Sequence, residues 1–128
     1  MQPKKIGIGI VVIIVIGIIA ASVGGSSGGA PSNAVVNNAP GSSTPGCEPD
    51  CFIPTTATIR AGGTITWMNG DTAAHTATAG TATGGPSGVF DSSLIMAGGS
   101  YSHTFEAAGT FDYFCMVHPW MSGVVIVR

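Results

Sequence analysis

The chain has 128 residues, of which only 8% are charged and 20 are glycine, a composition that favours short strands and turns over a helical bundle. Both lysines lie before residue 6, so the chain from residue 24 onward has two arginines, six acidic residues and a formal charge of −4. The sequence contains no basic patch, which argues against nucleic acid as a partner.

A charge-free apolar run extends over residues 6–23, directly after Lys4 and Lys5. As a helix it would measure about 27 Å, which is enough to span a bilayer. The lysines in the short segment 1–5 predict that this end stays in the cytoplasm and that the rest of the chain lies on the outer face. The alternative is a cleaved signal peptide, for which Ala20-Ala21-Ser22 offers small residues, but the apolar run is longer than usual for one. We therefore expect a retained, single-pass transmembrane anchor.

Residues 24–46 are rich in Gly, Ser, Asn, Ala and Pro and have no periodic apolar pattern. Such a segment cannot bury enough apolar surface to offset the entropy lost on ordering. We expect a flexible linker here, with an r.m.s. reach of about 25 Å. The folded domain is then expected over residues 47–128.

Short strand patterns separated by glycine-rich turns follow the linker. In residues 64–68, Ile65 and Trp67 alternate with threonines, which is typical of a half-buried strand with Trp67 in the core. Residues 80–88 are expected to form a loop. Further strands are expected at residues 56–60, 75–79, 90–95, 101–105, 111–115 and 124–127. The pattern predicts an all-β fold, a Greek-key sandwich.

One short segment, residues 114–121, combines three metal-binding side chains. Cys115, His118 and Met121 place a thiol, an imidazole and a thioether at intervals of three residues. Two histidines and one cysteine in a plane, with a long axial methionine, are the ligand set of a mononuclear electron-transfer copper centre. The segment therefore predicts such a centre, provided that a second histidine reaches it.

The second imidazole has two candidates, His75 and His103. His75 is the better one, because it follows the end of a strand, where a loop can bring it over the Cys115 loop. His103 alternates with Tyr101 and Phe105 on an expected strand, so we expect it to be structural or exposed at the surface.

Residues 64–71 followed by His75, together with residues 109–115, resemble the cupredoxins, in particular the amicyanin and plastocyanin types. The resemblance covers about residues 51–128. The Cys-x-x-His-x-x-Met spacing is similar to the short ligand loop of amicyanin. The resemblance implies one copper, cycling between Cu(II) and Cu(I), held by His75, Cys115, His118 and an axial Met121.

The chain departs from the family pattern at one position beside the expected centre. Many cupredoxins have Asn directly after the first histidine ligand, whereas this chain has Thr76. A side chain at this position can brace the cysteine loop by hydrogen bonding. Thr76 therefore bears on the rigidity and the potential of the centre.

Cys47 and Cys51 flank Glu48-Pro49-Asp50 at the start of the expected domain. Outside the cytoplasm, two cysteines this close favour a disulfide. The alternative is a second copper site, but a dinuclear centre would need both thiols in the loop of the His and Met ligands, and that loop has only Cys115. So short a ring should pin the junction of linker and domain more than it stabilises the domain.

Together with the expected anchor, the resemblance predicts a membrane-tethered, one-electron carrier on the outer face rather than an enzyme. Redox partner proteins are expected to dock transiently near His118 and Trp120. The apolar patch for this docking is expected to comprise Met116, Val117, Pro119 and Trp120. Two alternatives stay open: a copper carrier or store, which should release copper readily, and a copper enzyme acting on a small nitrogen oxide, which would need an open coordination position in place of Met121.

Overall fold

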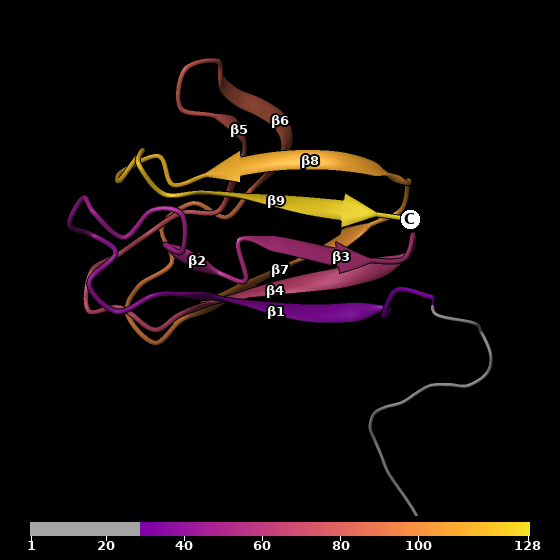
Figure 1. Ribbon diagram of the computed structural model, residues 1–128, viewed down its shortest axis with the longest axis horizontal. Coiled ribbons are helices and arrows are strands. Elements are labelled where there is room, and N and C mark those ends of the chain that lie inside the picture. The colour runs from indigo at the N-terminus through magenta and orange to yellow at the C-terminus, as the bar shows by residue number, and fades with distance from the viewer. Residues whose placement is uncertain (1–28) are drawn as a thin grey trace, which may run out of the picture.

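The structure is a computed structural model that describes residues 29–128. Its strands are β1 Asn33–Asn38, β2 Phe52–Ile53, β3 Thr56–Ile59, β4 Gly63–Asn69, β5 Thr78–Thr81, β6 Gly85–Asp91, β7 Ser100–Phe105, β8 Gly109–Phe114 and β9 Ser122–Val127. They form two packed sheets, with the orders β2-β1-β4-β7 and β3-β9-β8-β5-β6 (Figure 1). Consecutive strands repeatedly change sheet, and the described residues contain no helix. The prediction of an all-β sandwich is confirmed.

The core lies between the sheets and centres on Trp67, which is fully buried as predicted. Its ring centroid lies 5.2 Å from that of Phe90 and 5.3 Å from that of Tyr113. Tyr113 fits because its neighbour on β9 is Gly123, where any Cβ would collide with the tyrosine ring. Each large apolar side chain buried in this way contributes about 1.5–3 kcal/mol to stability. The packed aromatic core therefore supports the strands from which the metal-binding loops extend.

The flexible linker predicted for residues 24–46 is wrong where the structure describes it. β1 lies inside this stretch, pairs in parallel with β4 and buries Val36 in the core. Gly63 opens β4, and a Cβ there would collide with the carbonyl oxygen of Ser32, so a glycine permits this close approach. Little in the local pattern indicates β1, because its apolar run is short and its hydrogen bonds come from a strand distant in sequence. The sandwich therefore includes residues well before the predicted start at Cys47.

Residues 1–28 lie outside the described part of the chain, and with them the predicted N-terminus 1–5, the predicted anchor 6–23 and the first part of the predicted linker. Within residues 29–128, no helix is long and apolar enough to cross a membrane. The described chain begins at the same end of the sandwich as the C-terminus (Figure 1). Arg60 fixes this start, because its backbone N–H donates to the Pro31 carbonyl at 2.9 Å.

The segment between β4 and β7 also differs from the prediction. Where residues 80–88 were expected to form a loop, β5 and β6 form a hairpin that projects from the second sheet (Figure 1). Gly80 and Gly85 adopt φ angles of 126° and 82°, in the range that glycine tolerates best. Instead of starting a strand, His75 forms an isolated bridge with Ile95, in which the two backbones exchange hydrogen bonds of 3.1 and 2.7 Å. This exchange fixes the backbone of His75.

A disulfide joins Cys47 to Cys51, with a Cα–Cα distance of 5.0 Å. Cys51 is buried in the core beside the equally buried Phe52. Because β1 precedes the bridge, the disulfide lies in the loop between β1 and β2, inside the domain. The predicted position, at a junction of linker and domain, is therefore wrong.

Candidate metal centre

Three of the four predicted ligands meet at the end of the sandwich opposite the C-terminus. The Nδ1 atoms of His75 and His118 lie 3.0 Å apart, and each is 3.7 Å from the Sγ of Cys115. A point equidistant from the three atoms is about 2 Å from each, close to the 2.0–2.3 Å of metal bonds to imidazole and thiolate in protein zinc sites. A soft thiolate with two imidazoles suits copper. The three side chains therefore fit a trigonal metal site.

The ring of His75 is oriented by a buried carboxylate. Its Nε2 lies 2.7 Å from Oδ2 of Asp71, and the two side chains are 0% and 3% exposed. Since an ionised carboxylate only accepts hydrogen bonds, Nε2 carries the proton and donates it. Nδ1 then has a free lone pair on the side of Cys115 and His118. His75 is thus held in the tautomer that a metal requires.

Asp71 is ionised at neutral pH. Burial acts to raise the pKa of Asp71, but the Gly41 N–H, at 2.9 Å from Oδ1, and the His75 ring lower it to about 2. A carboxylate behind a ligand imidazole strengthens the donation of that imidazole to a metal. Sequence reasoning missed Asp71, although a carboxylate four residues before a candidate histidine ligand was a usable signal.

Cys115, His118 and Met121 lie on one short loop between β8 and β9. The Cys115 N–H donates to the Met121 carbonyl at 3.1 Å, and the Met121 N–H donates to the His118 carbonyl at 2.9 Å. The loop is therefore closed by its own backbone. This closure holds the thiol and the imidazole on the same side, facing His75.

Thr76 joins the two ligand segments by two hydrogen bonds. Its backbone N–H donates to the Sγ of Cys115 at 3.3 Å, and its Oγ1 accepts the backbone N–H of Met116 at 2.9 Å. An N–H that points at the sulfur stabilises the negative charge of a thiolate. Thr76 thus forms the brace that its position next to the first histidine suggested.

Burial separates the methionines of the described chain. Met121 is 0% exposed and packs in the core cluster that contains Cys115. The other three described methionines, Met68, Met96 and Met116, are 45%, 63% and 47% exposed. Met121 is therefore the thioether that is available inside the protein at the end of the ligand loop.

His118 differs from His75 in being partly exposed. Burial and the neighbouring His75 ring lower the pKa of His118, against the opposite effect of the Asp71 charge. The ring is therefore neutral at pH 7, which is the form that binds a metal.

An apolar rim surrounds the exposed edge of His118. The ring of Trp120 lies 5.4 Å from that of His118, and its Nε1–H donates to the Ser42 carbonyl at 2.9 Å. Met116 and Val117 are each about half exposed. The loop between β1 and β2, which contains Ser42, thus holds Trp120 and with it this part of the ligand loop.

Other metal-binding side chains are excluded from the centre. As expected, His103 lies on β7, where its ring packs 5.0 Å from Phe90 and 4.7 Å from Phe105. Cys47 and Cys51 lie close to a carboxylate, but their sulfurs are bonded to each other. In the described chain, the remaining group of potential ligands is His75, Cys115 and His118.

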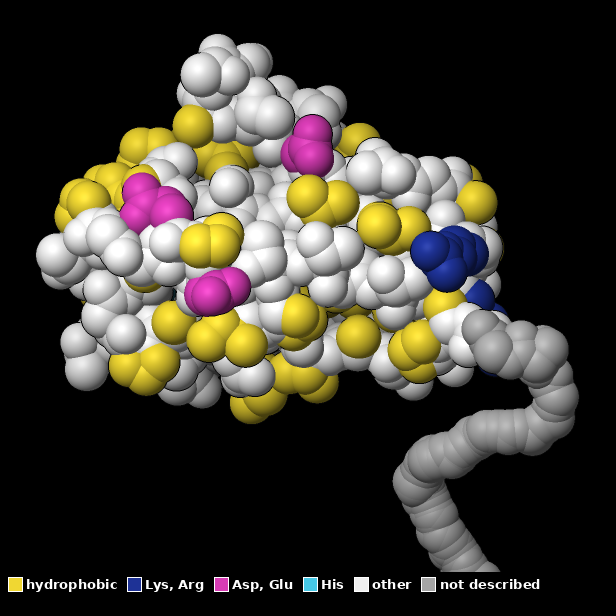
Figure 2. Space-filling view, viewed as in Figure 1, with side chains coloured by type: hydrophobic (Ala, Val, Ile, Leu, Met, Phe, Trp, Pro, Cys, Tyr) yellow, Lys and Arg dark blue, Asp and Glu magenta, His cyan; other side chains and the backbone are white. Residues whose placement is uncertain are grey.

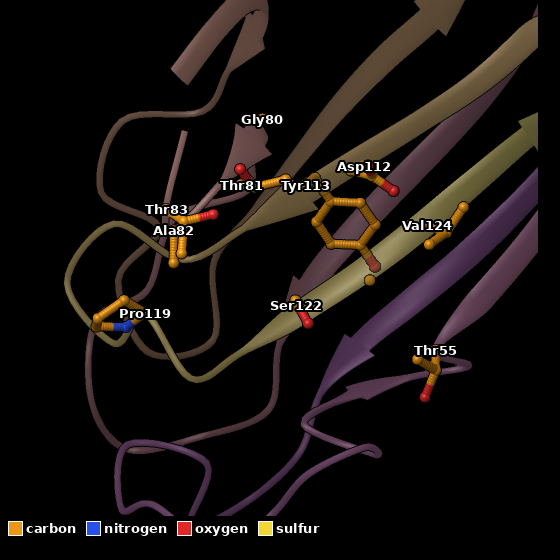
Figure 3. Close-up of a pocket in the computed structure, with 11 residues that line it drawn as sticks. Thr55, Gly80, Thr81, Ala82, Thr83, Asp112, Tyr113, Pro119, Ser122 and Val124 are labelled. Atoms are coloured by element: carbon orange, nitrogen blue, oxygen red, sulfur yellow. The ribbon is translucent and has the colours of Figure 1, made fainter. Parts of the chain in front are cut away.

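A groove of about 390 Å³ lies beside the centre, on the outer face of the second sheet. Figure 3 shows Pro119 of the ligand loop close to Ala82 and Thr83 of the β5–β6 hairpin, with Val124 of β9 farther along. None of the four predicted ligands lines this groove. The metal centre is therefore a packed cluster of side chains and is distinct from the groove.

Comparison with known proteins identifies the family. Residues 51–128 match the family described as copper binding proteins of the plastocyanin/azurin family, and the chain belongs to this family. The donor set and this membership agree, so copper is the metal of the centre, with one ion in the typical site of His75, Cys115, His118 and Met121.

Similar sequences include amicyanin from Paracoccus versutus, which is 35% identical over 83 residues, covering 65% of this chain and 62% of that protein. Plastocyanin from Scenedesmus fuscus is 35% identical over 95 residues, covering 60% of this chain and 86% of that protein. The chain spans only 53% to 62% of the length of the three amicyanins that it matches.

Similar structures include a purple cupredoxin from Nitrosopumilus maritimus, with a TM-score of 0.69 and 28% identity, covering 74% of this chain and 99% of that one. A Cu(I) form of a mutant amicyanin has a TM-score of 0.58 and 28% identity, covering 77% of this chain and 85% of that one. The sandwich is therefore cupredoxin-like.

The buried pair of His75 and Asp71 generates a prediction on copper affinity. Asp71→Ala should weaken copper binding by about 10–100-fold, because the imidazole loses both its orientation and its charged partner. The matched control is Asp112→Ala, which removes an exposed carboxylate from β8. Competition with a chelator of known affinity measures both variants. Equal affinities in the two variants would mean that Asp71 does not support the ligand.

Proposed function

We propose that this protein is a one-electron carrier that uses a single copper ion. The observation that carries this proposal is the clamp of two hydrogen bonds between Thr76 and the Cys115 loop, which holds the ligand segments together within the protein. Bound copper supplies the Cu(II)/Cu(I) couple and a strongly covalent bond to the thiolate. A ligand set held by the protein changes little between the two oxidation states, and this small reorganisation makes electron transfer fast.

Burial of the ligands favours a carrier of electrons over a carrier of copper. His75, Cys115 and Met121 are fully buried, and His118 alone of the four ligands is partly exposed. Exchange of copper with another protein would require ligands that can be reached and displaced. The same burial disfavours an enzyme acting on a small nitrogen oxide, because Met121 occupies the interior where a substrate position would have to open.

We further propose that electrons enter and leave through the exposed edge of His118. The rim around it consists of Met116, Val117 and Trp120, which are apolar and at least partly exposed. A small apolar patch of this kind suits brief encounters with partner proteins, since transient redox interfaces usually bury less than about 1,200 Å².

We also propose that residues 6–23 anchor the protein in a membrane, with the copper domain on the outer face. The Arg60 side chain donates to the Ala30 carbonyl at 3.2 Å, so at most six residues, 24–29, separate the anchor from the domain. Because the chain enters the sandwich opposite the metal centre, the centre would face away from the membrane (Figure 1).

The charge distribution fits this orientation. In the described chain, the basic side chains are Arg60 and Arg128, and Figure 2 shows dark blue side chains at the end where the described chain begins. The acidic residues Glu48 and Asp50 lie in the loop between β1 and β2. The end of the domain that carries the centre is therefore free of basic residues, and it would meet partners from the aqueous side.

The axial position provides the test of the proposed function. The wild-type protein should cycle reversibly between Cu(II) and Cu(I), with tight binding in both states. Met121→Leu should raise the reduction potential, because a thioether donates charge that favours Cu(II), and Met121→Gln should lower it. Voltammetry of the copper-loaded protein measures both shifts.

The control is Met116→Leu, which changes an exposed methionine of the same loop and should shift the potential far less. If the wild-type protein lost its copper on reduction, the electron-carrier proposal would fail in favour of copper delivery. If Met121→Leu left the potential unchanged, Met121 would not be the axial ligand.

The membrane anchor is tested by fractionation of cells that express the full chain. We expect the copper protein in the membrane pellet, released by detergent but not by high salt, whereas a chain that starts at residue 29 should remain in the supernatant and still bind copper. If cells that express the full chain instead yield a protein in the supernatant that lacks about its first 20 residues by mass spectrometry, the segment is a cleaved signal peptide.

A further inference from the structure

The brace at Thr76 continues into the second sheet as a chain of hydroxyl groups. The Oγ1 of Thr76, which accepts the Met116 N–H, lies 2.9 Å from the Oγ1 of Thr78. The Thr78 hydroxyl in turn donates to Oδ1 of Asp91 at 3.1 Å. Asp91 lies on β6 directly opposite Thr78 on β5. Three hydrogen bonds thus connect the ligand loop with a carboxylate at the surface.

The direction of these hydrogen bonds is set from the carboxylate end. A carboxylate only accepts and each hydroxyl has a single proton. Because Thr78 donates its proton to Asp91, its oxygen must accept the proton of Thr76. The lone pairs of Thr76 Oγ1 are then available to the backbone N–H of Met116. Thr78 and Asp91 thus orient the Thr76 hydroxyl, which braces the ligand loop.

Burial makes this arrangement rigid where it matters. Thr78 is 0% exposed and Thr76 is 4% exposed, so water cannot readily replace either hydroxyl as a partner. Asp91 is exposed, but its Oδ1 also accepts the Ser93 N–H at 2.9 Å, which fixes the carboxylate.

We propose that Thr78 and Asp91 are positioning residues of the copper centre, acting through Thr76 on the loop of Cys115. This inference rests on the proposed copper site and adds two residues that coordinate nothing themselves. If the hydrogen bonds from Thr76 through Thr78 to Asp91 are lost, the Thr76 hydroxyl is free to rotate, and the Met116 N–H then loses a fixed acceptor. The Cys115 loop loosens relative to Thr76, and with it the hydrogen bond from the Thr76 N–H to the sulfur.

The expected effect is on the redox balance of the centre. An N–H donor to the thiolate stabilises the more electron-rich Cu(I) state, so weakening it favours Cu(II). The ratio of Cu(I) to Cu(II) affinity should fall by about threefold to tenfold, as expected for one weakened hydrogen bond. For a one-electron couple this fall corresponds to a potential lower by about 30–60 mV.

The experiment compares four variants of the full, copper-loaded chain by voltammetry and visible spectroscopy. Thr78→Val removes the buried hydroxyl with little change in volume and should lower the potential. Thr78→Ser keeps a hydroxyl and should have a potential close to that of the wild-type protein. Asp91→Ala should lower the potential by less, because water can reach the exposed position. The matched control is Thr66→Val on β4, in the other sheet. It removes a hydrogen bond of similar length, 2.8 Å, between the hydroxyl groups of Thr66 and Ser102, and it should leave the potential unchanged.

Copper content and the midpoint of thermal unfolding are measured for each variant, so that a loss of folding is not read as a shift in potential. A Thr78→Val protein with full copper content and an unchanged potential would overturn the proposal, and an unchanged Asp91→Ala would remove Asp91 from it. A wild-type protein that binds no copper or does not cycle would instead contradict the proposed function, so the two failures are distinguishable.

Discussion

The centre depends on one small clamp, the two hydrogen bonds that Thr76 makes to the loop of Cys115. His75 and Cys115 are 40 residues apart in sequence, and both lie in loops outside the strands, where the sheets alone would leave them freedom to move. Thr76 removes that freedom by binding the thiol with its N–H and the next backbone amide with its hydroxyl. The bridge of His75 to Ile95 and the buried Asp71 then fix the remaining ligand ring.

The sandwich separates two tasks between its two ends. One end has the entry of the described chain, the C-terminus and the arginines, and the other has the metal-binding loops (Figures 1 and 2). β1 contributes to this separation, because it carries the chain along β4 from one end to the other before the loop containing Ser42 and the disulfide begins. The proposed anchor before β1 would therefore hold the domain by the end opposite the proposed site of electron exchange.

Local features of the site could be predicted from the sequence, because Cys115, His118 and Met121 are ligands at fixed short spacings and alternation places Trp67 in the core. β1 could not be predicted from the sequence, since a short apolar run between polar residues becomes a strand only through hydrogen bonds to β4. The β5–β6 hairpin was missed because its glycines resemble a loop until their φ angles are known. The chain from Thr76 through Thr78 to Asp91 depends on the pairing of β5 with β6, which no local pattern shows.

The proposed function depends most directly on His75, Cys115 and His118 together binding one copper ion. The most direct measurement is the visible absorption spectrum of the copper-loaded protein in the Cu(II) state, recorded for the wild type and for single variants of these residues and of His103. This ligand set predicts an intense thiolate-to-copper band that is lost in Cys115→Ser and retained in His103→Ala. A colourless Cu(II) protein, or a band that survives His75→Ala and disappears in His103→Ala, would contradict it.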